Sequence, residues 1–472
     1  MSRITGGTRV SALTTGMGTL IKPGGKGRWR DRLRLSVWED YATLKGLGVR
    51  VLGAHRASNR RSSRAPQVAT TRGPYDSNFF RAHVTQDLLP FWERHSIDPS
   101  HGGFLTHLTR DGALYDSTTK ISPMQARMMY AFVIGYDLTS ETRYWEIAEQ
   151  GFRFLIGHCW DQRFGGWYRS VWRDGRAKDP DKYTYDQAYV LIGLIEYYRM
   201  TQDPLARRYI AETREVLDRH GWDVHHRGYY RRCNRDWTAS STEKTICAHL
   251  DMMTALYLLY QVDQDAAAYT RLLEVADLVS GPMCDTKYHC VLETFHSNWL
   301  YNPLRTRDQI QIGHNLKAAW LLLEVFRLTG DSAYYSCAGR LLNYSLRYGW
   351  DHQHHGFYQH VYRNGVLANT EKLWWPECEG FSALLLMYRV SSNPMYLEYF
   401  TRLADFSLTY LFDREYGEWF RSCHPDGTVA DERKGHTWKA AYHTVQACFY
   451  AQRYLDETGS PQLSGGSDES RV

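Results

Sequence analysis

The chain has 472 residues, of which 43% are hydrophobic and 23% are charged, a composition typical of a folded protein. No run of 18 apolar residues occurs, which excludes a membrane-spanning helix and a membrane partner. The net charge of +5 divides into about +12 over residues 1–72 and about −7 over residues 73–472. The remainder of the chain therefore offers no broad basic face, and we expect no nucleic-acid partner.

Three segments differ in composition. Residues 1–75 are basic and rich in Gly, Arg, Ser and Thr, which suits a disordered extension, an organelle transit peptide or an upstream stretch that is not translated. Residues 76–457 carry regular hydrophobic patterns and form the predicted catalytic domain, and residues 458–472 read as a disordered polar tail. Nine cysteines without a CxxC pair favour reduced thiols and a cytoplasmic protein.

One short phrase repeats six times along the predicted domain. An Asp is followed four or five residues later by Gly, or once by Cys, and aromatic residues come next. Consecutive copies are 63, 62, 62, 66 and 62 residues apart. Four copies end in a turn dipeptide, which predicts β-hairpins. The copies begin at Asp98, Asp161, Asp223, Asp285, Asp351 and Asp413, and the dipeptides are Asp111-Gly112, Asp174-Gly175, Asn364-Gly365 and Asp426-Gly427.

Two helical stretches separate consecutive hairpins, and one more helix precedes the first, at 76–94. Apolar residues recur there at i, i+3 and i+4, and Asp, Ser or Thr stands near most starts as an N-cap candidate. The first helix of each pair is predicted to begin near Ser122, Lys182, Lys244, Asp308, Lys372 and His436, and the second near Glu141, Asp203, Asp265, Asp331 and Asn393. Six such hairpins predict an all-α (α/α)6 toroid with short β-hairpins on one face. An open solenoid is the alternative, but the uniform period and the count of six favour a closed ring.

The repeat also predicts where polar side chains gather. The first helix of each pair follows a hairpin, so its N-terminal turn should face one mouth of the ring, where helix N-termini favour negative charge. Steps of about 63 residues from Gln125 lead to Gln187, Asp251, His314, Glu377 and His443, and close to these are Arg127, Tyr185, His249, Trp375 and Glu379. Such a set is not the composition of an apolar core.

Several short segments then resemble the N-acylglucosamine 2-epimerase and cellobiose 2-epimerase superfamily. The resemblance runs in order from about residue 80 to 456. It is carried by the Lys-x4-Gln-x-Arg of 120–127, the Tyr-Asp-Gln-Ala-Tyr of 185–189, Gly313-His314, the Lys-x-Trp-Trp-Pro of 372–376 and the Trp-Lys-x-x-Tyr-His of 438–443. It implies the (α/α)6 barrel and a sugar 2-epimerase or aldose–ketose isomerase that needs no cofactor and no metal.

The residue types suit that chemistry. The C2 proton of an opened sugar is acidic because the adjacent carbonyl can take up charge as a cis-enediolate, and histidine exchanges protons near pH 7. The resemblance makes His314 and His443 the two bases and Arg127 the enediolate-stabilising group. Trp374 and Trp375 offer a flat apolar surface to a sugar ring. The remaining substrate-binding candidates are Tyr185, His249, Asp251, Glu377 and Glu379.

The chain departs from the family pattern in two places. Lys317 stands where the family has the Glu of Gly-His-x-x-Glu, so we expect His314 to lack an orienting carboxylate. On the third of the first helices, Cys247, Asp251 and Thr254 replace the family's Asn, His and Glu. These replacements leave open a carbohydrate-binding relative with weakened catalysis.

Two other interpretations follow from residue types alone. Glu377 and Glu379 could form the acid/base pair of a glycoside hydrolase, since such enzymes also use this toroid. A histidine cluster at 352–355 invites a metal site, although a solvated loop is the better interpretation. The expected partner is a mono- or disaccharide, and the sequence is compatible with either a monomer or a homodimer.

Overall fold

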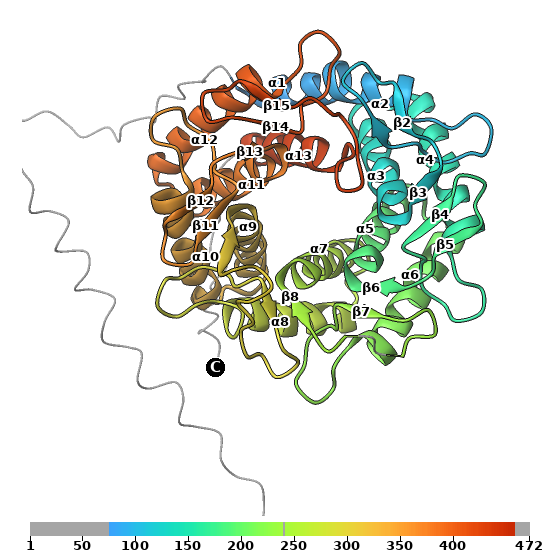
Figure 1. The fold of residues 1–472 in the computed structure, drawn as a ribbon, viewed down its shortest axis with the longest axis horizontal. Coiled ribbons are helices and arrows are strands. Elements are labelled where there is room, and N and C mark those ends of the chain that lie inside the picture. Colours follow the sequence, from blue (N-terminus) through green and yellow to red (C-terminus); the bar gives the residue numbers. More distant parts are fainter. Residues whose placement is uncertain (1–74, 239–240, 458–472) are drawn as a thin grey trace, which may run out of the picture. The chain divides into compact units, whose positions relative to one another are not determined.

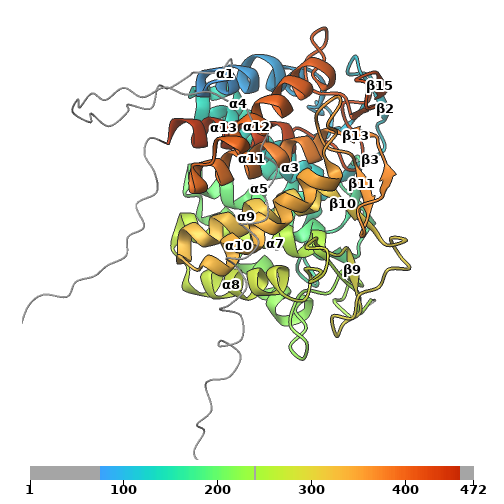
Figure 2. The same ribbon diagram turned by 90° about the vertical axis from the view of Figure 1, so that its left-hand side faces the viewer.

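The computed structural model describes residues 75–238 and 241–457, which lie within one compact unit, Thr71–Val472. The predictions for residues 1–74 and 458–472 fall outside the described residues. Within the described part the fold is helical, with short strands at one end (Figures 1 and 2). No helix there is both long and apolar enough to cross a membrane.

Six helices form the inner ring. They are α3 (Ser122–Thr139), α5 (Thr184–Thr201), α7 (Ile246–Asp263), α9 (Ile312–Thr329), α11 (Trp374–Ser391) and α13 (Tyr442–Asp456). Each contacts the next, and α13 contacts α3, so the ring is closed (Figure 1). In α9, 13 of 18 residues are buried, as expected for a helix enclosed by neighbours on nearly every face.

A second layer of helices surrounds the inner ring. Its members are α1 (Ser77–Ala82) with α2 (Leu89–His95), α4 (Thr142–Phe154), α6 (Pro204–Val216), α8 (Ala266–Ser280), α10 (Ser332–Tyr344) and α12 (Pro394–Phe406). Wider π-helical turns join α1 to α2 and extend four of the others, at η2 (His83–Leu88), η3 (Leu155–Cys159), η4 (Leu217–Gly221), η5 (Ser345–Gly349) and η6 (Ser407–Leu411). The predicted (α/α)6 toroid is therefore confirmed.

The outer helices begin where the sequence places their caps. Asp203, Asp265, Asp331 and Asn393 each accept a backbone N–H of the first turn. The predicted starts of the inner helices are less accurate. The start at Ser122 is confirmed, and Lys182, Lys244 and Lys372 lie two residues before their helices, in short strands. The starts near Asp308 and His436 are four and six residues too early.

The strands gather at one end of the ring, beside the N-termini of the inner helices (Figure 2). A strand that precedes an inner helix pairs antiparallel with the next hairpin, as β3 does with β4, so neighbouring repeats are joined by backbone hydrogen bonds. The turn dipeptides connect hairpin strands as predicted, and their glycines have φ between 85° and 91°, which side chains disfavour. The strands are β1 (His107–Leu108), β2 (Leu114–Asp116), β3 (Thr119–Ile121), β4 (Ser170–Trp172), β5 (Ala177–Asp179), β6 (Lys182–Tyr183), β7 (Arg232–Cys233), β8 (Lys244–Thr245), β9 (Thr294–Phe295), β10 (Gln309–Gln311), β11 (His360–Tyr362), β12 (Leu367–Asn369), β13 (Lys372–Leu373), β14 (Ser422–Cys423) and β15 (Val429–Asp431).

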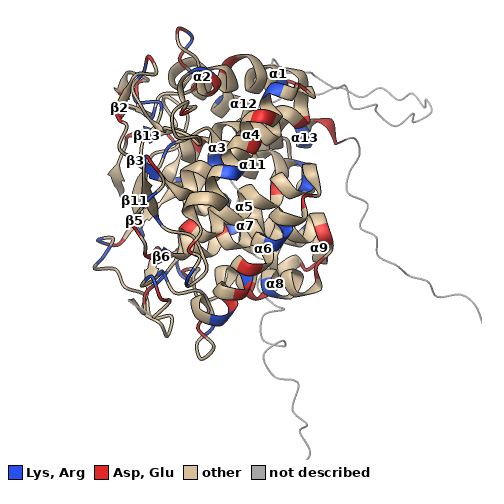
Figure 3. Cartoon of the chain, turned by 90° about the vertical axis from the view of Figure 1, so that its right-hand side faces the viewer, with Lys and Arg blue, Asp and Glu red and all other residues tan. Residues whose placement is uncertain are grey.

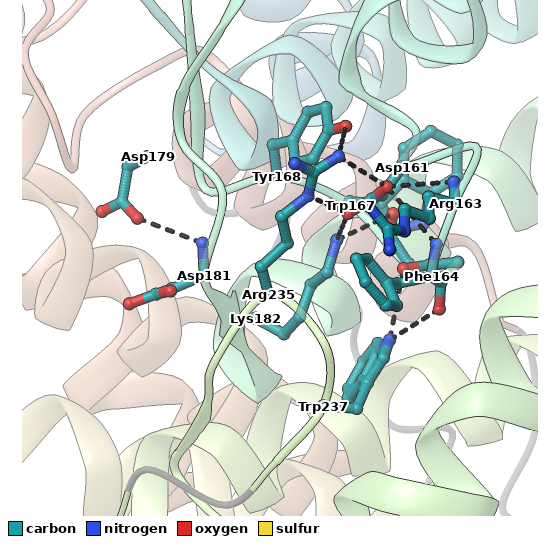
Figure 4. Close-up of polar contacts among 12 residues, drawn as sticks. Asp161, Arg163, Phe164, Trp167, Tyr168, Asp179, Asp181, Lys182, Arg235 and Trp237 are labelled. Carbon is teal, nitrogen blue, oxygen red and sulfur yellow. Dashed lines mark hydrogen bonds and ion pairs between the residues drawn. The ribbon is translucent and has the colours of Figure 1, made fainter.

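The repeated Asp of the hairpin is a structural ion-pair centre. Asp161 is fully buried, lies 3.2 Å from the ammonium of Lys182 and accepts two hydrogen bonds from Arg235 of the following hairpin (Figure 4). Equivalent lysine pairs occur at Asp98, Asp223, Asp351 and Asp413. The fourth repeat has Ile310 at the lysine position. In these five repeats the Asp thus ties its hairpin to the segment that leads into the inner helix.

Candidate active site

A cavity of about 540 Å³ opens at the hairpin end of the ring and reaches the first turns of the inner helices. Its volume is within the range of small-molecule sites. Aromatic rings and charged groups line it together. Of the predicted site residues, seven are in the lining, namely Tyr185, Asp251, His314, Trp374, Trp375, Glu379 and His443.

Two predicted substrate contacts, His249 and Glu377, do not line the cavity. His249 Nε2 accepts the backbone N–H of Tyr229 at 2.9 Å, and the Glu377 carboxylate accepts that of Phe357 at 2.9 Å. The same position of three other inner helices, α3, α5 and α9, holds its hairpin in the same way, through Gln125, Gln187 and Asn315. We therefore assign His249 and Glu377 to hairpin support, not to substrate contact.

The side chains that face the centre lie two residues further along each helix. Tyr189, Asp251, Lys317 and Glu379 line the cavity from four inner helices, and Arg127 holds the same position of α3 behind the wall. The Arg127 guanidinium lies 3.6 Å from the centre of the Tyr189 ring, whose hydroxyl is 3.5 Å from the Lys317 ammonium. Steps of 63 residues from Gln125 were expected to give residues at one height in the cavity. They give a mixture of cavity residues and hairpin-supporting residues, and that part of the prediction is wrong.

Lys317 and Asp251 form a buried ion pair between α9 and α7. Burial by itself lowers the pKa of the lysine, but the carboxylates of Asp251 and Glu379 raise it above its ordinary value, so the ammonium stays charged. The two departures from the family pattern at Asp251 and Lys317 thus compensate each other. Cys247 lines the cavity, whereas the hydroxyl of Thr254 donates within its own helix.

His314 stands in the first turn of α9 and does have an orienting carboxylate. Its Nδ1 lies 2.8 Å from Oε2 of Glu293, a residue of the fourth hairpin. The expectation that Lys317 leaves this histidine without a carboxylate is therefore wrong, because Glu293 supplies one from outside the helix. A proton on Nδ1 shared with Glu293 leaves Nε2 available as a base.

His443 is the second residue of α13, and its ring is buried. Burial, together with the Arg127 and Lys317 cations, lowers the pKa of His443 well below its ordinary value, so the imidazole is neutral at pH 7. Its Nδ1 lies 3.2 Å from Oε1 of Glu379, but neither atom has a hydrogen-bond partner among the described residues.

The two histidines share one aromatic neighbour. The ring of Trp375 lies 5.3 Å from that of His314 and 6.2 Å from that of His443. Gly313 allows this approach, since a Cβ there would come within 2.2 Å of the Trp375 ring. Trp374 also lines the cavity, and its buried indole N–H has no acceptor among the described residues.

Arg127 lies behind the cavity wall rather than in it. Its guanidinium donates to the hydroxyl of Tyr185 at 2.5 Å and to the backbone carbonyl of Trp438 at 2.9 Å. Burial raises the pKa of Tyr185 despite the neighbouring cation, so this lining hydroxyl keeps its proton. Arg127 therefore supports three residues of the lining, Tyr185, Tyr189 and Trp438.

The sequence interpretation missed several cavity residues. Arg169, Arg231, Gln359 and Arg421 line the mouth, and each follows the aromatic pair of its hairpin. Comparing the copies of the hairpin phrase residue by residue would have revealed this shared position. Within the described residues, no group of three or more His, Cys, Asp or Glu side chains could hold a metal ion.

Comparison with protein families adds a decisive observation. The family model described as N-acylglucosamine 2-epimerase matches residues 102–447, which is most of the chain and includes the whole cavity. The chain belongs to this family. It is an enzyme of the carbohydrate epimerase and isomerase class and acts on a saccharide.

The matches to named relatives extend over nearly the full length of each relative. Cellobiose 2-epimerase of Bacteroides fragilis is 26% identical over 380 residues, 77% of this chain and 95% of that protein. D-mannose isomerase of Marinomonas mediterranea is 25% identical over 398 residues, 81% and 98% of the two chains. The solved structure of cellobiose 2-epimerase from Bacillus thermoamylovorans B4167 is 25% identical with a TM-score of 0.75, over 80% of this chain and 98% of that one. A family 76 glycoside hydrolase at 13% identity and a TM-score of 0.61 shares the fold alone.

Proposed function

We propose that this family member is a sugar 2-epimerase or aldose–ketose isomerase that works on the opened reducing-end sugar, with His314 and His443 exchanging the proton at C2. The observation that carries the proposal is the pair of imidazoles beside one indole at the bottom of one cavity. Epimerisation needs proton exchange on both faces of C2, and two bases from separate helices can flank a carbon placed between them.

In the proposed reaction, one histidine takes the C2 proton and the electron pair of the broken C–H bond forms a C1=C2 enediolate. The negative charge then rests on O1, where the Tyr185 hydroxyl and the Lys317 ammonium are the available donors. Return of a proton to the opposite face of C2 gives the epimer, whereas delivery to C1, with transfer of the O2 proton to O1, gives the ketose. Arg127 is a positioning residue in this scheme, since it holds the Tyr185 hydroxyl.

The surroundings of the two histidines differ, and each suits one of the two proton transfers at C2. His443 is neutral at pH 7, because burial and two cations lower its pKa, and can accept a proton. His314 is held by Glu293, whose carboxylate can share a proton with Nδ1 while Nε2 exchanges one with substrate. Trp374 and Trp375 would cover an apolar face of the sugar, and the free indole N–H of Trp374 would reach a hydroxyl.

The test is proton NMR in deuterium oxide with D-mannose, D-glucose, N-acetyl-D-mannosamine and cellobiose. We expect deuterium at C2 of one of them, together with its epimer or ketose. His443→Ala and His314→Ala should each reduce that incorporation by about 10²–10⁴-fold. The matched control is His352→Ala, an exposed histidine of the fifth hairpin, which should behave as the parent protein. Full incorporation by either of the first two variants would refute the proposed roles. Saturable sugar binding without any exchange would instead identify a binding protein.

A further inference from the structure

One position of the hairpins carries a polar side chain toward the cavity in five of the six repeats. In each hairpin the position comes directly after a pair of aromatic or apolar residues, such as Trp167-Tyr168. The residues at this position are Arg169, Arg231, Glu293, Gln359 and Arg421. Glu293 holds His314, and the other four line the cavity. Three of the five are arginines, which a neutral sugar does not require.

The arginines stand above the histidines, at the open end of the cavity. Their side chains are 22–32% exposed, whereas those of Lys317 and Asp251 are 4% and 3% exposed. Arg169 and Arg231 flank one ring, that of Tyr183, at 4.3 and 6.0 Å from its centre. A substrate whose C1–C2 end lies at the histidines would bring its other end to these guanidinium groups.

The acidic partners of Arg169 do not fully neutralise it. Asp186 accepts a hydrogen bond from Arg169 at 3.3 Å, but burial raises the pKa of this carboxyl to about 7, so near neutral pH it is charged only part of the time. Asp179 lies further away, at 3.8 Å, and is 40% exposed. Arg169 therefore keeps positive charge and unused N–H donors.

Arg231 has a similar surplus of charge. The carboxylate of Glu243 lies 3.5 Å from Arg231, but it also accepts a hydrogen bond from Arg305 at 2.9 Å. One acidic group thus serves two guanidinium groups. Figure 3 shows acidic and basic residues mixed along the hairpin loops.

Arg421, on another hairpin, repeats the arrangement. Its guanidinium donates to Asp431 at 3.3 Å and lies 3.6 Å from Glu371. Asp431 is also bound by Arg433, at 2.6 Å. Arg421 thus shares Asp431 with a second arginine but also has Glu371 beside it, so it is better neutralised than Arg169 and Arg231.

We propose that Arg169 and Arg231 bind an anionic group, a phosphate or a carboxylate, at the end of the sugar remote from C1, so that the substrate is an acidic sugar. The inference rests on the proposed function, which places C1 and C2 at the histidines. Guanidinium groups bind both anions through paired N–H donors, and the half-enclosed mouth strengthens such bonds relative to water.

The substrate test compares D-mannose, D-mannose 6-phosphate and D-mannuronate, which share the configuration at C2 and differ at C6. We measure C2 deuterium exchange and derive kcat/KM for each. At least one acidic sugar should exceed D-mannose by about tenfold or more, the equivalent of one charge-assisted hydrogen bond. The preference should shrink as salt screens the charges. The phosphate and carboxylate arms identify the anion, and a neutral sugar that matches both would overturn the proposal.

The variants Arg169→Gln, Arg231→Gln and their combination test the site itself. The ratio of kcat/KM for acidic over neutral sugar should fall about tenfold for each arginine removed. Arg176→Gln is the matched control, because this 79% exposed arginine lies in the turn of the same hairpin as Arg169 and should leave the ratio unchanged. A ratio that survives the double variant would refute the assignment.

Failure of the proposed function is distinguishable from failure of this inference. If no sugar exchanges deuterium, calorimetric titration with D-mannose 6-phosphate, D-mannuronate and D-mannose still tests the anion site. Tighter binding of either acidic sugar, lost in the double variant, supports the inference. Equal binding of all three rejects it. Arg231→Lys, which keeps the charge, covers the case in which the glutamine variants do not fold, and should retain part of the preference.

Discussion

The buried pair of Lys317 and Asp251 gives the sharpest test of how this cavity is built. Lys317→Met leaves a carboxylate at Asp251, which is 2% exposed, without its cation. Breaking a buried ion pair from one side costs about 3–5 kcal/mol, because the remaining charge is neither solvated nor paired. We expect that loss in the free energy of unfolding of Lys317→Met, and a similar one for Asp251→Leu.

The double variant Lys317→Met with Asp251→Leu should be far less damaged than the sum of the two single losses. Replacing both charges with apolar groups removes the desolvation cost together with the attraction, so we expect a net change of at most about 1 kcal/mol. Urea unfolding of the four proteins, followed by tryptophan fluorescence and far-UV circular dichroism, measures the cycle. Additive losses would refute the view that these two departures from the family pattern compensate each other.

The same substitution also changes the pH dependence of exchange. Burial is the main cause of the low pKa of His443, and the cations Arg127 and Lys317 lower it further. Removing Lys317 should therefore raise that pKa toward its ordinary value of about 6.5. A general base works above its pKa. The acid limb of the C2 exchange rate should therefore move to higher pH in Lys317→Met, and an unmoved limb would show that Lys317 does not act on His443.

Three further predictions concern single positions. Glu293→Gln should lower kcat for C2 exchange by about 10–100-fold with little change in KM, because His314 loses the carboxylate that orients it; an unchanged kcat contradicts this. Gly313→Ala should displace the Trp375 ring and reduce the tryptophan fluorescence change on sugar binding as well as activity. Asp161→Asn should lower the free energy of unfolding at pH 7 by about 2 kcal/mol, because Arg235 and Lys182 outweigh burial and hold the pKa of this carboxyl at about 2. That contribution is present above about pH 4 and is lost as pH falls toward 2, so parent and variant should converge in acid-titration unfolding.

The fold could be predicted almost completely from the sequence. A hairpin phrase at a nearly constant period, with two helices after each copy, leaves few arrangements that bury every apolar face, and a closed ring of six is one of them. The caps of the outer helices were visible as Asp203, Asp265, Asp331 and Asn393, because side-chain capping is a local property. The inner starts were placed less well, since lysines such as Lys182 lie in strands that pair with another repeat.

The ring, the family motifs and the two histidines in the first turns of α9 and α13 could therefore be predicted from the residue pattern. The layer to which each polar residue belongs depends instead on how the helices are rotated in the folded ring. An α-helix turns about 100° per residue, so Glu377 and Glu379, two positions apart, point to nearly opposite sides, one supporting a hairpin and the other facing the cavity. The repeat spacing in the sequence varies by a residue or more, so it cannot tell which of these two positions faces the cavity. Nor could it show that Glu293 would reach His314 from the preceding hairpin, or that Asp251 would meet Lys317 from the neighbouring inner helix, because both contacts depend on how separate elements pack.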